Sequence, residues 1–343
     1  MMEIPGEYGS GSGTIVRLSC ALSALTGKEI RIRDIRSKRP NPGLRHQHLE
    51  VVRTIAKLCS AEVKGDEVGS KEIEFRPKTI KGGEFEVNIE TAGSVGLLSY
   101  AVLIPAVFGK GRTALRIKGG SIASKWSPPV PYLENVLLPV LSKMGVRARF
   151  EIRKYGFYPV GGSEVVFEIE PCEEIKPVNL AEPGKIERIE GLSIASESLR
   201  DKSVAERQIK GFQRIIKEEA DIKPLYVESV CPGSVLVVWA RTTSGCVLAG
   251  DAVGERRKPS EVVGEEAGFK LKEEIEYEST VGEHLADQLI PFLALAKGKS
   301  EIIAPSLTDH VKTNMWLCER FLGTRFETRE EGENVRIVCY GLS

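Results

Sequence analysis

Apolar and polar residues along the chain repeat one pattern three times. In each copy an apolar helical stretch ends at a Gly-Lys pair and a β-branched strand follows at once. The pairs are Gly27-Lys28, Gly109-Lys110 and Gly298-Lys299. Glycine directly after the last apolar turn is the preferred left-handed residue at a helix C-terminus. Each pair therefore predicts the end of a helix and the start of a strand.

A second helix and two more strands follow each of these pairs. The second helices are expected at 49–58, 133–144 and 314–322, and the strand pairs at 62–63 with 72–75, 147–152 with 164–169, and 324–328 with 334–339. The repeating unit is βαβαββ, and internal copies of one unit are typical of a domain built by repetition. We expect an α/β (α+β) fold in which three βαβαββ repeats form a large domain.

The spacing of the copies indicates an insertion. The first two Gly-Lys pairs lie 82 residues apart, whereas the third lies 189 residues beyond the second, and connecting loops rarely hold so many extra residues. Inside the extra segment, strands are expected at 185–189, 234–240 and 246–249, and helices at 204–219 and 260–275. We therefore expect a small α/β domain at 183–277, inserted into a large domain made of 1–182 and 278–343.

Composition agrees with a folded chain of this size. The 343 residues are 41% hydrophobic and 28% charged, which excludes a disordered, collagen-like or coiled-coil protein. No run of 18 apolar residues is present, and the first residues do not resemble a signal peptide. We expect no membrane partner and a cytoplasmic location.

Charge adds one local feature to a neutral chain. Basic and acidic residues number 48 each, so the overall charge indicates no polyanionic partner. Between Lys28 and Arg53, however, eight basic residues stand against three acidic ones. Such a run is commonly a solvated surface. The alternative is a phosphate site, because the run holds a Pro/Gly loop in which Arg36 and Arg39 present planar guanidinium donors.

Two further positions at the start of expected helices carry candidate chemistry. His310 lies between the expected strand 301–303 and helix 314–322, a place where active-site groups and bound anions are common, although a single loop histidine is often structural. The glycine-rich run 6–13 offers backbone N–H groups to an anion, but it matches neither phosphate-loop pattern and a flexible loop is the alternative. Equivalent junctions of repeats gather round one centre, so we expect His310 and the Arg36–Arg39 loop to face each other.

Motifs spread along the chain resemble those of the RNA 3′-terminal phosphate cyclase family. They cover 21–30 with 35–49, 155–162, 204–208, 283–288 and 308–314, in the family's order. The resemblance spans nearly the whole chain and implies the same fold of three repeats with a small inserted domain. It also implies ATP and a divalent metal ion, Mg²⁺ or Mn²⁺, as cofactors, and an RNA with a 3′-phosphate end as partner. The oligomeric state is left open.

The resemblance implies a three-step reaction that begins at His310. The histidine attacks the α-phosphorus of ATP, AMP passes to the RNA 3′-phosphate, and the neighbouring 2′-hydroxyl displaces AMP to close a 2′,3′-cyclic phosphate. A neutral imidazole suits this role because it is nucleophilic near pH 7 and leaves readily once protonated. The implied roles are catalysis for His310, Arg17 and Arg39, nucleotide or phosphate binding for Arg36, Gln47, Asp287, Gly11 and Gly13, and metal binding for Asp287.

The chain departs from the family motif in the glycine-rich run. The family usually has Glu-Gly-Gly-Gly-Gln beginning seven residues before the arginine matched by Arg17, whereas here Ser10 replaces the glutamate and Thr14 the glutamine. The lost carboxylate is one that the family associates with its metal. The alternative function is therefore a non-catalytic RNA-binding relative in RNA processing or ribosome biogenesis, although that branch lacks the histidine present here.

Overall fold

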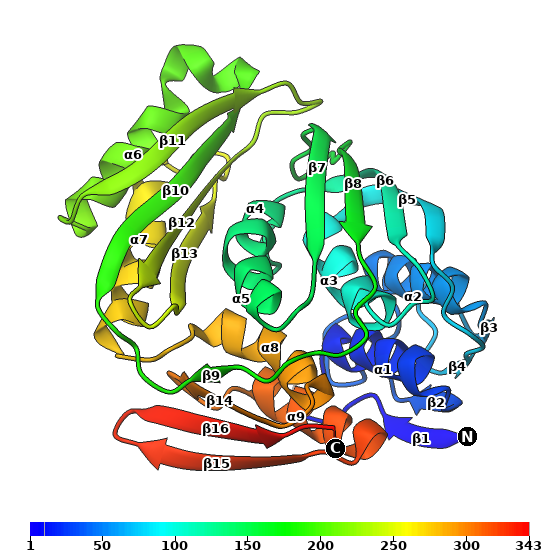
Figure 1. Ribbon diagram of the computed structural model, residues 1–343. Helices are drawn as coiled ribbons and strands as arrows, with labels where there is room; N and C mark the ends of the chain where they lie inside the picture. The colour runs from blue at the N-terminus through cyan, green and yellow to red at the C-terminus, as the bar shows by residue number, and fades with distance from the viewer. Residues whose placement is uncertain (10, 343) are drawn as a thin grey trace.

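The computed structural model describes residues 1–9 and 11–342 (Figure 1). Ser10, whose replacement of a glutamate is noted above, lies outside the described residues. Within these residues no helix is long and apolar enough to cross a bilayer. The cytoplasmic location stays a prediction.

Three of the sheets share one strand order, and this confirms the βαβαββ repeat. In each sheet the first and second strands of the repeat pair in parallel. The second strand pairs antiparallel with the fourth, and the fourth pairs antiparallel with the third. The sheets are β1 (Met2–Pro5), β2 (Ile30–Arg33), β4 (Ile73–Arg76) and β3 (Glu62–Lys64); β5 (Gly83–Ser94), β6 (Thr113–Ser121), β8 (Glu164–Ile169) and β7 (Ala148–Lys154); and β9 (Asn179–Leu180), β14 (Lys299–Ala304), β16 (Asn334–Tyr340) and β15 (Arg325–Glu331).

The helices of the three copies pack on one another in a shared core. They are α1 (Gly13–Thr26), α2 (His46–Cys59), α3 (Val95–Ala106), the continuous run α4 (Val130–Tyr132), η1 (Leu133–Leu137) and α5 (Leu138–Lys143), then α8 (Glu283–Leu295) and α9 (Asp309–Leu322). Helix α1 contacts α2, α3 and α9, and α8 contacts α9. Residues far apart in the sequence therefore meet at the ends of these helices.

The Gly-Lys pairs mark helix ends less uniformly than expected. Gly27 is the left-handed cap of α1, with φ of 70°. Helix α3, however, already ends at Ala106, and Gly109 has no left-handed φ. Helix α8 ends at Leu295 and is followed by an extended residue before Gly298. Apolar residues beyond the last turn, such as Val107, are buried by tertiary packing instead of continuing the helix.

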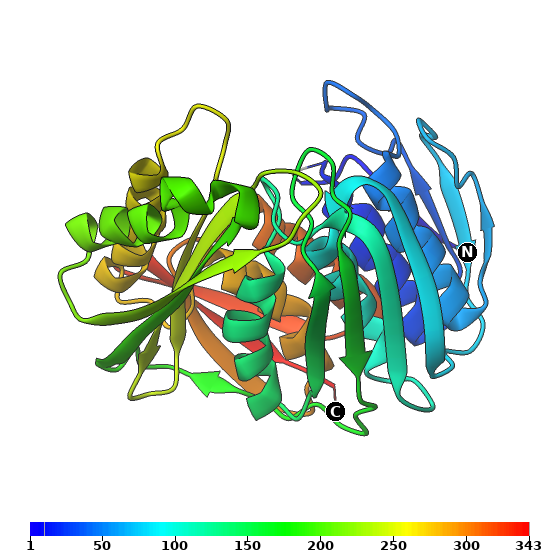
Figure 2. The same cartoon turned by 90° about the horizontal axis from the view of Figure 1, so that it is seen from above.

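The fourth sheet lies between β9 and α8 in the sequence and beside α4 and α5 in space (Figure 1, Figure 2). It has the order β11-β10-β12-β13. Its elements are β10 (Ile186–Ser196), η2 (Glu197–Lys202), α6 (Val204–Ile215), β11 (Ala220–Val227), β12 (Ser234–Thr242), β13 (Val247–Val253) and α7 (Ser260–Glu276). We refer to this unit as the insert. Its exact boundaries at 183 and 277 stay a prediction.

Two details of the insert differ from expectation. The helix expected at 204–219 ends at Ile215, because the next residues form strand β11, which was not expected. This strand lies at the edge of the sheet, and an edge strand tolerates both Pro224 and the charged residues that obscured its pattern.

Strand β12 is buried on both faces: Leu236 and Val238 pack with α6 and α7, whereas Val235 and Val237 join the core of the large domain. The insert sheet therefore stands directly against the repeats.

Candidate active site

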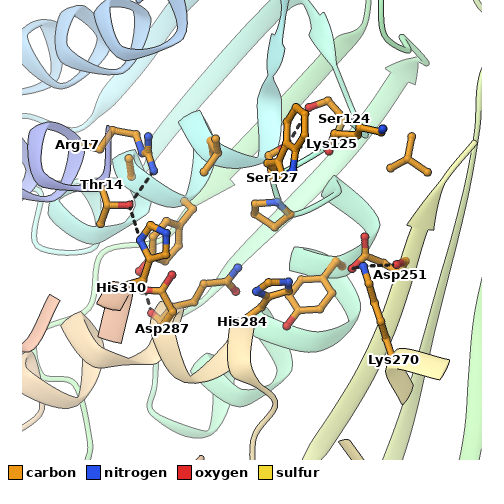
Figure 3. A pocket seen from close by; sticks show the side chains of 18 of the residues that line it. Thr14, Arg17, Ser124, Lys125, Ser127, Asp251, Lys270, His284, Asp287 and His310 are labelled. Carbon is orange, nitrogen blue, oxygen red and sulfur yellow. Dashed lines mark hydrogen bonds and ion pairs between the residues drawn. The ribbon is translucent and has the colours of Figure 1, made fainter. Parts of the chain in front are cut away.

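A cavity of about 500 Å³ lies between the repeats and the insert. Thr14, Arg17, Asp287 and His310 line it from the repeats, and Asp251 and Lys270 line it from the insert (Figure 3). The volume is within the range of small-molecule sites, which favour junctions between domains. The cavity is therefore the candidate active site.

His310 lies in the first turn of α9. The helix begins five residues earlier than expected because Thr308 caps it, its Oγ1 accepting a hydrogen bond from the Val311 N–H at 3.1 Å. The Nδ1 atom of His310 lies 3.4 Å from Oγ1 of Thr14 on α1, and Arg17 donates to the same oxygen at 3.2 Å (Figure 3). Helix α1 of the first repeat packs against α9 of the third, and the Thr14 hydroxyl is the point of contact between them at this site.

The charges around His310 favour its neutral form. Burial lowers the pKa of the His310 imidazole below its ordinary value, and the positive charges of Arg17 and Arg39 lower it further, against a smaller opposite effect of Asp309. Burial also lowers the pKa of Arg17, to about 10, so Arg17 is still charged at neutral pH. A neutral imidazole beside a cationic guanidinium is suited to attack an anionic phosphorus centre.

Asp287 of α8 lines the same cavity as His310 and Arg17. The Asn314 side-chain amide donates to the Asp287 backbone oxygen at 3.0 Å and also to its carboxylate. Burial raises the pKa of Asp287 to about 7, with Arg17 lowering it and Glu283 raising it. Two buried acceptors, Asn314 Oδ1 and Gln288 Oε1, have no hydrogen-bond partner among the described residues, and both residues line the cavity. The site therefore holds unused oxygen acceptors next to a carboxylate.

The other expected site residues lie outside the cavity wall. They are Arg36, Arg39, Gln47, Gly11 and Gly13. Arg36 donates through Nη1 to the backbone oxygens of Asn41 at 2.8 Å and Gly43 at 3.3 Å. These hydrogen bonds stabilise the loop that carries Arg36. Arg39 is close enough for its charge to act on His310, which places part of the basic loop toward that histidine. Gln47 is half-buried in the first turn of α2.

The two glycines serve the packing of the glycine-rich run. Gly11 has φ of 53° and its N–H donates to the Tyr8 oxygen at 3.0 Å, so this donor is already used within the loop. Gly13 opens α1, and a Cβ placed there would overlap Nε2 of His48. Only glycine allows this close approach.

His48 is a residue that the sequence analysis missed. It is buried, and its Nδ1 accepts a hydrogen bond from the Arg45 N–H at 3.1 Å. Burial and the charges of Arg17, Arg36 and Arg45 lower the pKa of His48 to about 3, which keeps it neutral. Its place on the apolar face of α2, one turn before Val51 and Val52, was the available signal.

The comparison with known proteins adds the family. The family model described as RNA 3′-terminal phosphate cyclase matches residues 8–328. The chain belongs to the RNA 3′-terminal phosphate cyclase family.

Curated members with that name cover nearly all of this chain. The protein of Methanopyrus kandleri is 41% identical over 97% of each chain. That of Pyrococcus abyssi is 44% identical over 95% of each chain, and that of Thermococcus gammatolerans is 45% identical over 98% of each. The resemblance noted from the motifs is confirmed.

Proposed function

We propose that this protein converts an RNA 3′-terminal phosphate into a 2′,3′-cyclic phosphate at the expense of ATP. The observation that carries the proposal is the neutral His310, which contacts Thr14 through Nδ1 and lies beside the cation of Arg17 in a cavity. Family members that are more than 40% identical to this chain are named for this activity.

The first step is the transfer of AMP to the enzyme. If the Nδ1–H of His310 donates to Thr14, the lone pair remains on Nε2. This lone pair forms a bond to the α-phosphorus of ATP while the bond to pyrophosphate breaks. Arg17 then stabilises the charge that develops on the phosphoryl oxygens without competing as a nucleophile. Arg39, whose charge reaches His310, Arg36 and Gln47 are proposed to bind further phosphate oxygens.

The remaining steps transfer AMP to RNA and close the ring. An oxygen of the RNA 3′-phosphate attacks the α-phosphorus of the adenylate, and the imidazole leaves. The 2′-hydroxyl of the terminal ribose then attacks the 3′-phosphorus, loses its proton and displaces AMP. Asp287, with a pKa raised to about 7, is suited to exchange a proton near neutral pH.

The residues present also fit a divalent metal ion. Within the described residues no group of three or more His, Cys, Asp and Glu side chains is arranged to hold one. Mg²⁺, however, commonly takes one or two carboxylates and completes its shell with phosphate oxygens and water. Asp287, once deprotonated, would supply the carboxylate, and Asn314 Oδ1, which has no partner among the described residues, is a further oxygen beside it. A bound ion would neutralise charge on the ATP phosphates.

The test of the proposal is self-adenylation. Incubation with α-labelled ATP should place the label on the protein, and His310→Ala should abolish an acid-labile, alkali-stable adduct. His46→Ala is the matched control, because His46 is exposed at the start of α2 and does not line the cavity. A wild-type protein that binds RNA but takes no label with Mg²⁺ or Mn²⁺ would instead support the non-catalytic alternative, which the loss of the motif glutamate at position 10 favours.

A further inference from the structure

Trp126 is exposed to solvent at the wall of the cavity. It has 94% of its surface exposed, the largest fraction among the large hydrophobic side chains that the structure describes. Its loop joins β6 to α4 and contributes Ser124, Ser127 and Pro128 to the cavity wall. Figure 3 shows Ser124 and Ser127 across the cavity from His310. An exposed indole therefore stands where a ligand extending out of the site would pass.

The loop that carries Trp126 is ordered by its own contacts. The hydroxyls of Ser124 and Ser127 lie 2.8 Å apart, and the Ser127 hydroxyl donates to the Ser124 backbone oxygen at 3.1 Å. Trp126 itself has a left-handed φ of 59°, which is uncommon for a bulky residue. The indole is thus held in solvent by a defined loop.

Three more exposed apolar side chains lie on loops joined to this one. They are Tyr158, Val160 and Val230, with 68%, 53% and 57% of their surfaces exposed. A bridge joins Ala123 to Phe157, and a second joins Tyr155 to Ser229 of the insert. We call Trp126, Tyr158, Val160 and Val230 the apolar rim. Single exposed apolar residues need no explanation, but several on connected loops, one of which lines the cavity, indicate a binding surface.

Positive charge lies next to the rim. Lys125 Nζ is 5.7 Å from the centre of the Trp126 ring and 2.6 Å from a carboxylate oxygen of Glu255 in the insert. Arg256 and Arg257 follow Glu255 directly and are exposed. Neither guanidinium has an ion pair or hydrogen bond with a described residue. Two cations without a partner among the described residues therefore follow directly on Glu255, whose carboxylate pairs with the lysine beside the ring.

We propose that the apolar rim binds the single-stranded RNA that precedes the 3′-phosphate, with a base stacked on Trp126 and backbone phosphates bound by Arg256 and Arg257. Aromatic rings that stack bases beside cations that hold phosphates are the usual means of binding a single strand without reading its sequence. This inference rests on the proposed function, which places the RNA end near His310.

The position of the ring favours RNA over the adenine of ATP. Leu97, Tyr132 and Trp126 all line the cavity. Leu97 is half-buried and Tyr132 is buried, whereas Trp126 is almost fully solvated. Stacking on one open ring suits a nucleotide of a longer strand. Recognition at the rim should therefore tolerate any base and should require an unpaired end.

The test measures RNA affinity in the absence of ATP. The probe is a fluorescently labelled single-stranded oligoribonucleotide with a 3′-phosphate, followed by anisotropy. Trp126→Ala should raise Kd roughly five- to a hundredfold, as expected for the loss of one base stack, and Trp126→Phe should restore most of the affinity. Arg256→Gln with Arg257→Gln should lower the slope of log K against log salt by about 1.4, for two phosphates of a single strand. The matched control is Tyr340→Ala, since Tyr340 is an exposed aromatic on β16, outside the rim.

Self-adenylation of the same variants separates the inference from the proposed function. An unchanged Kd for Trp126→Ala overturns the inference, and so does a loss of adenylation with RNA affinity intact, which would assign the ring to ATP. If the wild type binds RNA through Trp126 but takes no label from ATP, the cyclase proposal fails while the RNA surface stands. A blunt duplex probe should be insensitive to Trp126, and equal sensitivity of duplex and single strand would also contradict base stacking.

Discussion

Thr14 and His310 are 296 residues apart in the sequence, yet one contact joins them in the cavity. The Thr14 hydroxyl oxygen lies between His310 Nδ1 and the Arg17 guanidinium. A donor such as Arg17 occupies one lone pair of that oxygen, and the other is available to an Nδ1–H. Thr14, at the position where the resemblance implies a glutamine, is therefore suited to orient His310, the proposed nucleophile.

Thr14→Val should slow adenylation while preserving the fold. The valine keeps the shape but removes the hydroxyl that orients His310, and the loss of one such hydrogen bond corresponds to about 0.5–1.5 kcal/mol, or roughly two- to tenfold in rate. Thr14→Ser should restore the rate. The measurement is the single-turnover rate of label transfer from α-labelled ATP between pH 5 and 8. The rate should rise as His310 loses its proton and should level off above its lowered pKa; equal rates for Thr14→Val and wild type would exclude the positioning role.

The sequence predicted His310, Arg17 and Asp287 from family motifs, but it did not predict the contacts that connect them. Thr14 was noted only as a departure from a motif, because its role depends on α9, which lies at the other end of the chain. His48 was not singled out in the sequence analysis, although the structure buries it against Gly13. Contacts between distant segments have no local signature in the sequence. The contacts that orient His310 therefore could not be predicted.

Helix α1 begins at a position that carries a packing constraint. Alanine normally favours a helix more than glycine, but a Cβ on Gly13 would overlap His48 Nε2 and approach Arg17. We expect Gly13→Ala to lower the free energy of unfolding by about 1–3 kcal/mol, the usual cost of overpacking. Denaturant midpoints measure this. Gly111→Ala is the control, because no atom lies within 4 Å of a Cβ at that position.

A double variant identifies the cause of the loss. Gly13→Ala combined with His48→Ala should be destabilised by less than the sum of the single variants, since the small side chain at 48 removes the overlap. Strict additivity would mean that some other contact at Gly13 is responsible.

Elements with a regular pattern were predicted well, and those shaped by tertiary contacts were not. Strand β8 occupies Glu164–Ile169, the range expected from the sequence. Strand β11 was missed because an edge strand with Pro224 and two charged residues, Asp221 and Lys223, lacks a clear period. The early end of α3 was also missed, since buried residues such as Val107 continue the apolar pattern beyond the helix.

At the scale of the whole molecule, the insert closes the cavity and must be held against the repeats. Glu274 of α7 lies at this junction: its carboxylate accepts a hydrogen bond from the Ala249 N–H at 2.7 Å, and a Cβ on Gly282, just before α8, would overlap it. Burial raises the pKa of Glu274 to about 8, and the nearby charges of Asp251 and Glu283 act in the same direction. The folded protein therefore favours the protonated acid.

This raised pKa should make the protein less stable as the pH increases. The unfolded chain releases the Glu274 proton near the ordinary glutamate pKa of about 4.3, whereas the folded chain retains it up to about pH 8. Between these values the native state binds more protons, so the free energy of unfolding falls with rising pH. We expect Glu274→Gln, which has no proton to lose, to flatten the decline in melting temperature between pH 5 and 8. Glu276→Gln is the control, because Glu276 is exposed on the same helix. An equal decline in wild type and Glu274→Gln would mean that another buried acid, such as Asp287, dominates the pH response.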